Sequence, residues 1–170
     1  MDTLDVFNQY VAPVNSIPFH ASRVHKLYQV NGELVKRTSS GDEVLDTVAI
    51  TEALTNMWEW LLESCAKVIL VGFNSSRFDN HVISHHTRLS CQPDLVDRVR
   101  SSVCCADFRT ILQQQGIRGR LGALYSSSNG PPLELHDAVS DVSAIIHIMG
   151  SLKVSLDRLQ SAGVSIKKYL

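Results

Sequence analysis

Three polar side chains have types and spacing that could support hydrolytic chemistry. His136 and Asp141 lie five residues apart, where a loop over 126–132 rich in Ser, Asn, Gly and Pro gives way to an apolar segment with helical periodicity. An aspartate can hold a divalent cation, and an imidazole can accept a proton near neutral pH. Helix capping and solvent-exposed side chains produce the same pattern, so this spacing alone leaves both interpretations open.

The third side chain, Asp79, follows a segment with the composition of a buried strand. Residues 67–73 are mostly apolar and β-branched, and they run into a polar turn and then Phe78 and Asp79. Ligands of open α/β sheets collect at the carboxyl ends of the strands. The sequence therefore predicts that Asp79 lies at a ligand-binding edge.

These two stretches resemble the motifs of a known family. Residues 72–83 resemble the second motif of the DEDDh 3′→5′ exonucleases, and residues 135–145 resemble their third motif, with the histidine five residues before the aspartate. Residues 103–112 and 119–125 resemble the segments between these motifs, and residues 6–13 and 17–25 resemble an earlier strand-plus-helix segment. The resemblance spans residues 7–149 and is nearest to the three-prime repair exonucleases and vertebrate exonuclease-like relatives.

The resemblance implies a fold, a reaction and a set of site residues. The fold is α/β and ribonuclease H-like, a mixed sheet flanked by helices, and the reaction is phosphodiester hydrolysis with two Mg²⁺ or Mn²⁺ ions. Asp141 would bind metal directly, Asp79 would support the second metal, and His136 would be the general base. Asn74 and Phe78 would shape the pocket for the terminal nucleotide, although Phe78 suits a core position equally well. The implied partner is nucleic acid with a free 3′ end, single-stranded DNA ahead of RNA.

The chain departs from the family at the first motif. An Asp-x-Glu strand and a second strand normally precede the segment that starts here at Val6, whereas residues 1–5 read Met-Asp-Thr-Leu-Asp. The expected sheet therefore lacks its first two strands, and the site lacks two of the family's four metal-binding carboxylates. A natural short form, an incomplete chain and a member without its catalytic centre all fit. We expect little turnover by this chain alone, and a second copy or a partner strand would complete the sheet.

Two classes of function stay open. One is a 3′→5′ exonuclease whose first-motif strand comes from elsewhere, and the presence of Asp79, His136 and Asp141 favours it. The other is a catalytically silent exonuclease-like module that binds nucleic acid or a protein partner, and the missing strand favours it. A serine or cysteine hydrolase has little support, because the sequence contains no nucleophile elbow and no motif-placed Ser or Cys.

A locally basic stretch lies between residues 98 and 120, partly offset by nearby aspartates. Such a mixture is typical of a solvated charged face. Arg118 and Arg120 are the better candidates for phosphate contacts, because Gly116 and Gly119 let the backbone approach a ligand closely.

Composition describes an ordinary globular chain. It has 170 residues, 44% hydrophobic and 19% charged, with a net charge of −1 that gives no global attraction to nucleic acid. We expect one domain over 1–170, ending in a helix and tail over 150–170. No apolar run reaches membrane-spanning length, and the acidic start is unlike a signal peptide, so we expect an intracellular protein of the cytoplasm or nucleus. We expect reduced core thiols at Cys65, Cys91, Cys104 and Cys105, which show no C-x-x-C spacing.

The surrounding sequence predicts the elements that position these side chains. Apolar residues recur at helical spacing from Thr51, with Trp58 on the core face and Trp60 off it. Asp107 follows a short strand and fits the N-cap of the next helix. The predicted inward face of the helix after residue 137 consists of Ala138, Val142, Ile145, Ile146 and Met149. Further predictions are strands over 5–12, 67–73 and 103–106, a helix over 77–89 and a last helix ending at Gly163.

Overall fold

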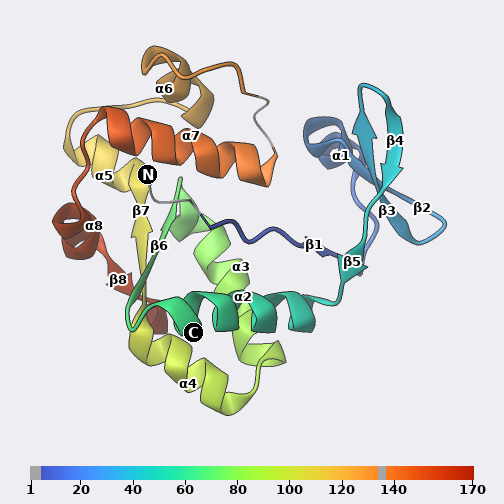
Figure 1. The fold of residues 1–170 in the computed structure, drawn as a ribbon, viewed down its shortest axis with the longest axis horizontal. Coiled ribbons are helices and arrows are strands. Elements are labelled where there is room, and N and C mark those ends of the chain that lie inside the picture. Colours follow the sequence, from blue (N-terminus) through green and yellow to red (C-terminus); the bar gives the residue numbers. More distant parts are fainter. Residues whose placement is uncertain (1–4, 134–136) are drawn as a thin grey trace.

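The computed structural model describes residues 5–133 and 137–170 and shows a mixed α/β protein (Figure 1). In that part of the chain, eight α-helices accompany three small sheets. A core built on β6 and β7 lies at one end, and a smaller lobe of α1 and three strands lies at the other (Figure 1). The prediction of an α/β fold with a mixed sheet and flanking helices is confirmed at this level.

The core sheet has the order β6 (Val68–Gly72), β7 (Val103–Asp107) and β8 (Val164–Ser165). β6 and β7 run parallel, with Val68 opposite Val103, and β8 is antiparallel to β7. The strands predicted over 67–73 and 103–106 are confirmed to within one residue at each end. Their apolar, β-branched composition suits strands that are covered on both faces.

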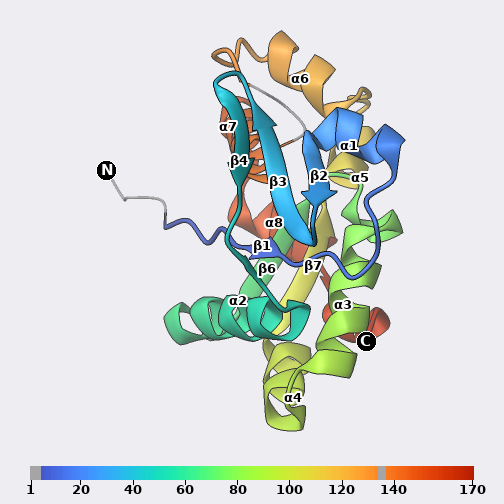
Figure 2. The ribbon, with the colours of Figure 1, turned by 90° about the vertical axis from the view of Figure 1, so that its right-hand side faces the viewer.

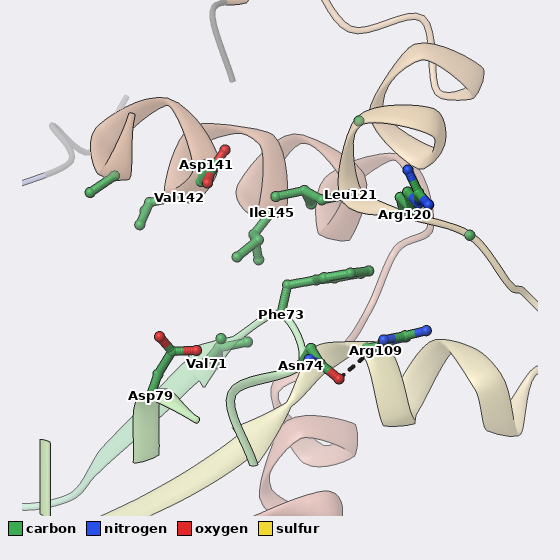
Figure 3. Close-up of a pocket in the computed structure, with 14 residues that line it drawn as sticks. Val71, Phe73, Asn74, Asp79, Arg109, Arg120, Leu121, Asp141, Val142 and Ile145 are labelled. Carbon is green, nitrogen blue, oxygen red and sulfur yellow. Dashed lines mark hydrogen bonds between the residues drawn. The ribbon is translucent and has the colours of Figure 1, made fainter. Parts of the chain in front are cut away.

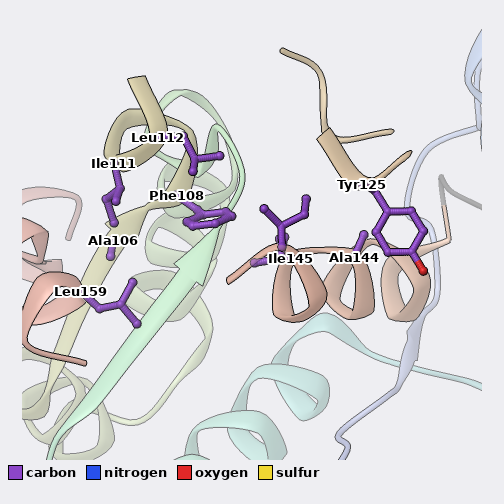
Figure 4. Close-up of a cluster of buried hydrophobic side chains, with 9 residues drawn as sticks. Ala106, Phe108, Ile111, Leu112, Tyr125, Ala144, Ile145 and Leu159 are labelled. Carbon is purple, nitrogen blue, oxygen red and sulfur yellow. The ribbon is translucent and has the colours of Figure 1, made fainter. Parts of the chain in front are cut away.

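Helices supply that cover. Val68 and Leu70 of β6 face a cluster formed with α2 (Ile50–Ser64) and α4 (Pro93–Ser102), and α3 (Asp79–Ser90) packs against α2. Side chains alternate along a strand, so Ile69 and Val71 face the other cluster, formed with α5 (Phe108–Gln114), α7 (Ala138–Ser151) and α8 (Leu156–Ala162). Figure 4 shows part of this second cluster, with Phe108 on the side of α7 that carries Ile145. The remaining helix, α6 (Leu121–Ser127), packs on α7.

The smaller lobe combines α1 (Phe19–His25) with an antiparallel sheet of β2 (Leu27–Val30), β3 (Glu33–Thr38) and β4 (Gly41–Val44), seen side by side in Figure 2. Asn31 and Gly32 connect β2 to β3 with φ angles of 52° and 89°, the backbone of a tight hairpin. The short parallel strands β1 (Tyr10–Val11) and β5 (Thr47–Val48) link the lobe to the core.

The strand predicted over 5–12 is wrong for most of its length, because only Tyr10 and Val11 form a strand. Trp60 accounts for the path of the earlier residues. Its indole N–H donates to Asp5 Oδ2 at 2.9 Å, and its ring centroid lies 5.5 Å from that of Phe7. The segment at 5–7 therefore packs on α2 instead of joining a sheet.

The inward face predicted for α7 is only partly right. Ile145 is buried and Met149 is partly buried, but Val142 is 54% exposed and Ile146 is 43% exposed. Ala144 and Ile148 are buried in their place. In the described residues β6 pairs with β7 alone, and Val142 lines an open pocket with Val71 and Gly72 of β6 instead of packing in the core.

The apolar content of the C-terminal helices also bears on membrane insertion. Within the described residues, no single helix is both long and apolar enough to span a membrane. α7 and α8 meet those criteria only as a pair with a 115° bend between them, and both bury side chains in the core.

The cysteines differ in exposure. Cys105 is buried, and this burial raises the pKa of its thiol to about 11. Cys91 and Cys104 are half-buried, whereas Cys65 is exposed, so the prediction of a core position is wrong for Cys65. All four are unbridged thiols, as predicted.

The prediction that Trp58 lies in the core is confirmed, and this residue offers a test of the fold. Its side chain is fully buried, and its indole N–H donates to the buried Thr87 Oγ1 at 2.9 Å. Replacing Thr87 by valine leaves that N–H without an acceptor, so we expect urea unfolding to show a loss of about 1–3 kcal/mol. The same substitution in a Trp58→Phe background should have a much smaller effect, because no indole donor remains. Equal losses in both backgrounds would show that the hydrogen bond does not contribute.

Candidate functional site

A pocket of about 640 Å³ lies at the carboxyl ends of β6 and β7, beneath α7 (Figure 3). Its apolar lining comes from three segments, with Val71 and Phe73 on the lower side in Figure 3 and Leu121, Val142 and Ile145 on the upper side. Its charged and polar side chains are Asn74, Asp79, Arg109, Arg120 and Asp141. An apolar lining with a few convergent polar groups is the usual character of a small-ligand site.

Two carboxylates reach this pocket from different elements. Asp79 is the first residue of α3, below the pocket in Figure 3, and Asp141 lies in the first turn of α7, above it. Both positions are at the amino-terminal end of a helix, where the helix dipole stabilises negative charge. The fold thus brings together two aspartates that are far apart in the sequence.

The loop between β6 and α3 is held in place by Asp107 at the end of β7. Its carboxylate accepts hydrogen bonds from the backbone N–H groups of Asn74 and Ser76, at 2.9 Å and 3.2 Å, and from the Ser76 hydroxyl at 2.5 Å. It also accepts from the backbone N–H of Arg109 at 3.0 Å, which confirms the predicted N-cap of α5. Asp107 therefore serves structure at the edge of the pocket and is not among its lining residues.

Gly72 and Asn74 shape the same loop. A Cβ atom at Gly72 would lie 2.6 Å from the Cβ of Ser75, so only glycine allows the short 3₁₀ helix at Ser75–Arg77 to pack against the strand end. Asn74 adopts a left-handed backbone with φ of 64°. Its side-chain oxygen accepts from Arg109 Nη1 at 3.1 Å, the dashed line in Figure 3, which orients both side chains toward the pocket.

The residues singled out in the sequence fall into three groups. Asp79, Asp141, Asn74 and Arg120 line one pocket. Phe78 is 67% exposed and outside the lining, which excludes a core position, and Arg118 is exposed and also outside the lining. His136 lies outside the described residues.

Sequence reasoning counted Arg109 in the basic stretch but preferred Arg118 and Arg120, and it missed the ion pair between Lys36 and Asp137. Asp137 is the N-cap of α7, and its Oδ1 accepts from the backbone N–H of Val139 at 3.2 Å. Lys36 of β3 donates to its Oδ2 at 2.8 Å. The cap was predictable from the sequence, because an aspartate stands directly before an apolar helix. Its lysine partner was not predictable, because Lys36 is 101 residues away in the chain.

The Lys36–Asp137 pair changes the acidity of both groups. The hydrogen bond from Lys36 lowers the pKa of Asp137, and the same contact raises the pKa of Lys36. The pair ties the smaller lobe to the first turn of α7, which carries Asp141. The position of that carboxylate therefore depends on a contact made by the other lobe.

The charged side chains of the pocket balance in number. Two are carboxylates, those of Asp79 and Asp141, and two are guanidinium groups, those of Arg109 and Arg120. Guanidinium groups suit phosphate oxygens, and the apolar lining suits a flat base or sugar. The arrangement can therefore hold an anionic ligand that also presents an apolar surface.

The metal ligands present do not complete a two-metal centre. Across residues 5–133 and 137–170, no group of three or more His, Cys, Asp or Glu side chains is gathered for an ion. Asp79 and Asp141 supply oxygen donors of the kind that Mg²⁺ and Mn²⁺ prefer, but a pair of such ions needs more ligands than these two.

Comparison with models of protein families found no match for this chain, and neither did a search of curated proteins.

We expect Asp107→Asn to loosen the loop that carries Asn74. An amide offers one acceptor oxygen and turns an N–H₂ group toward the donors of the loop, so unfolding should require about 2–3 kcal/mol less. Asp97→Asn is the matched control, because Asp97 is an exposed aspartate that contacts only a neighbouring arginine at 3.0 Å. Urea unfolding of both variants tests this role, and equal stability would contradict it.

We expect the Lys36–Asp137 pair to give a pH-dependent contribution to stability. Since the pKa of Asp137 is lowered, this contribution is present above the pKa of Asp137 in the unfolded chain and is lost as pH falls through the lowered folded value. Since the pKa of Lys36 is raised, it is also lost as pH rises through the raised folded value. Lys36→Met should therefore lower stability by about 1 kcal/mol or less at neutral pH and by nothing in strong acid. Lys153→Met is the control, and a difference that persists in strong acid would refute the assignment.

Proposed function

We propose that this chain is a 3′→5′ exonuclease-type domain with a ribonuclease H-like sheet that lacks its first two strands. One observation carries the proposal. Asp79 and Asp141, which come from the two motif-like segments of the sequence, line a single pocket together with Asn74 and Arg120. A resemblance in isolated sequence motifs does not require the two residues to line the same pocket, so their shared position supports the proposal.

In this proposal the pocket receives the 3′-terminal nucleotide of a nucleic acid, single-stranded DNA ahead of RNA. Arg120 and Arg109 contact phosphate oxygens, and the apolar lining contacts the base and sugar. Asn74 holds the Arg109 guanidinium in place through its side-chain oxygen. His136, next to the N-cap Asp137, is the proposed proton acceptor.

The same proposal limits the activity of the chain as given. Two carboxylates do not hold the two Mg²⁺ or Mn²⁺ ions of the family, so hydrolysis is weak or absent until further ligands reach the pocket. Within the described residues β6 pairs with β7 alone, and its side chains after Val68 are only partly buried. The exposed Val142 and Ile146 of α7 offer cover for another strand beside it. A partner strand or a second copy of the chain would supply that strand.

The second candidate is a catalytically silent module that binds a nucleic-acid end or a protein partner. The observation in its favour is the balance of charge in the pocket, where two guanidinium groups stand against two carboxylates. Such a pocket holds a terminal phosphate without needing a metal ion. The two candidates therefore share a ligand and differ in turnover.

Binding without divalent cations tests the pocket itself. With a 5′-fluorescein-labelled (dT)₁₅ strand in EDTA, Arg120→Gln should weaken binding about threefold to tenfold, because a phosphate contact is lost. Asp141→Asn should strengthen binding about twofold to fivefold, because it removes a negative charge near that phosphate. Asp97→Asn removes the same charge far from the pocket and should change nothing.

A time course of the same strand in Mg²⁺ or Mn²⁺ then separates the two candidates. Stepwise shortening that stops in Asp141→Asn and in Asp79→Asn identifies an exonuclease. Intact strand, with the pocket-dependent binding described above, shows that the chain by itself acts as the silent module and that an exonuclease would need a further strand to supply ligands. Binding that is unchanged in Arg120→Gln and Asp141→Asn, without shortening of the strand, refutes both candidate functions.

A further inference from the structure

A second groove lies on the smaller lobe, between α1 and the adjoining ends of β2 and β3. It has a volume of about 560 Å³. We refer to it as the α1–β3 groove, and its lining residues are Phe19, Ser22, Arg23, Lys26, Tyr28, Arg37, Thr38 and Ser39. None of them belongs to the pocket beneath α7.

Positive charge is concentrated in this groove. Three of its lining residues are cationic, four carry hydroxyl groups, and none is acidic. A carboxylate beside the groove, that of Asp42, lies 3.6 Å from the Arg37 guanidinium, and both side chains are more than half exposed. Because the whole chain has a net charge of −1, the positive charge of the groove is local and does not reflect a basic protein surface.

Aromatic rings accompany the cations. Phe19 is 77% exposed, and the Arg23 guanidinium lies 5.9 Å from its ring centroid. The Arg37 guanidinium lies 5.1 Å from the centroid of the half-buried Tyr28 ring. Each ring thus has a cation over it, while α1 buries none of its own side chains. A phenylalanine left this exposed beside arginine offers a flat surface on which a ligand can stack.

The groove faces away from the contact with α7. Side chains alternate along β3, so Lys36 and Arg37 point to opposite faces of the small sheet. Lys36 reaches Asp137 on one face, while Arg37 lies with Tyr28 and Asp42 on the other. Substitutions in the groove can therefore be made without disturbing the ion pair that supports Asp141.

We propose that the α1–β3 groove binds single-stranded nucleic acid, with phosphates at Arg23, Lys26 and Arg37 and a base stacked on Phe19. Single-strand sites combine a cationic path for the backbone with aromatic side chains for the bases, and both are present here. An acidic peptide would use the cations but leave the exposed ring without a role. The choice of ligand rests on the proposed function. The α1–β3 groove would hold the substrate of that function at a second point, away from the pocket.

Fluorescence anisotropy with the full chain and a circular (dT)₃₀ tests the groove apart from the pocket, because a circle has no 3′ end. We expect Arg23→Gln and Arg37→Gln each to weaken binding about threefold to tenfold and to lower the salt dependence by about 0.7 per lost phosphate contact. Phe19→Ala should weaken binding about fivefold or more. Phe19→Trp, which keeps a stacking surface, should restore it.

Matched controls come from α3. Arg88→Gln removes an exposed arginine, and Leu89→Ala removes an apolar side chain that is 63% exposed. Neither should change binding. An abasic circle should bind wild type and Phe19→Ala equally, because it has no base to stack.

Three outcomes would overturn the proposal. The first is binding of the circle that is unchanged by substitution of Arg23, Arg37 or Phe19. The second is binding that needs the arginines but is the same in Phe19→Ala, and the third is equal binding of polyglutamate, which would make this a general polyanion site. The circle could bind through the groove while binding of the linear strand is unchanged in Arg120→Gln and Asp141→Asn and no shortening occurs. That result would refute the proposed function and support the groove. If only the linear strand binds, the groove fails and the proposed function stands.

Discussion

The position of the pocket depends on the carboxylate of Asp107. It stands at the end of β7 and accepts hydrogen bonds from the loop that follows β6 and from the first turn of α5. Hydrogen bonds to a carboxylate are stronger than neutral ones, and here several of them meet at one group. They fix the turn that holds Asn74 and leads into α3, and therefore the place where Asp79 enters the pocket. A loop of this length between a strand and a helix would otherwise have several conformations of similar energy.

A second aspartate has the same role on the other side. Asp137 caps α7 and pairs with Lys36, so the helix that carries Asp141 is fixed at its first turn and tied to the smaller lobe. Two structural aspartates thus position two pocket aspartates. The carboxylates of Asp107 and Asp137 accept hydrogen bonds mainly from backbone N–H groups and a lysine. Asp79 and Asp141 lie at helix N-termini and line a pocket that also contains two arginines. The four carboxylates differ in their surroundings and not in their chemistry, so residue type alone does not separate their roles.

Local patterns explain which features were predictable. The strands β6 and β7, the core face of Trp58 and the cap at Asp107 all depend on neighbouring residues in the sequence, and each was read correctly. Asp79 was predicted at the ligand edge of the sheet from its place after a strand, whereas only the family resemblance predicted that Asp141 belongs to the same site. Features set by distant contacts were missed, namely the Lys36–Asp137 pair, the packing of residues 5–7 on Trp60 and the role of Arg109. The inward face of α7 was misjudged for a related reason, since periodicity defines an apolar stripe but not which part of it a neighbour covers.

The exposed apolar residues of α7 and the unpaired edge that β6 has in the described part of the chain both bear on how the sheet is covered. Parallel strands are normally covered on both faces and paired on both sides, and an apolar edge without charge or proline invites further pairing. The sequence of β6, Val-Ile-Leu-Val-Gly, contains neither device, and Val142 and Ile146 of α7 are exposed. Both proposed functions are therefore compatible with a further strand beside β6. They differ in what that strand would carry, because carboxylates on it would enlarge the ligand set of the pocket, whereas an apolar strand would only close the sheet.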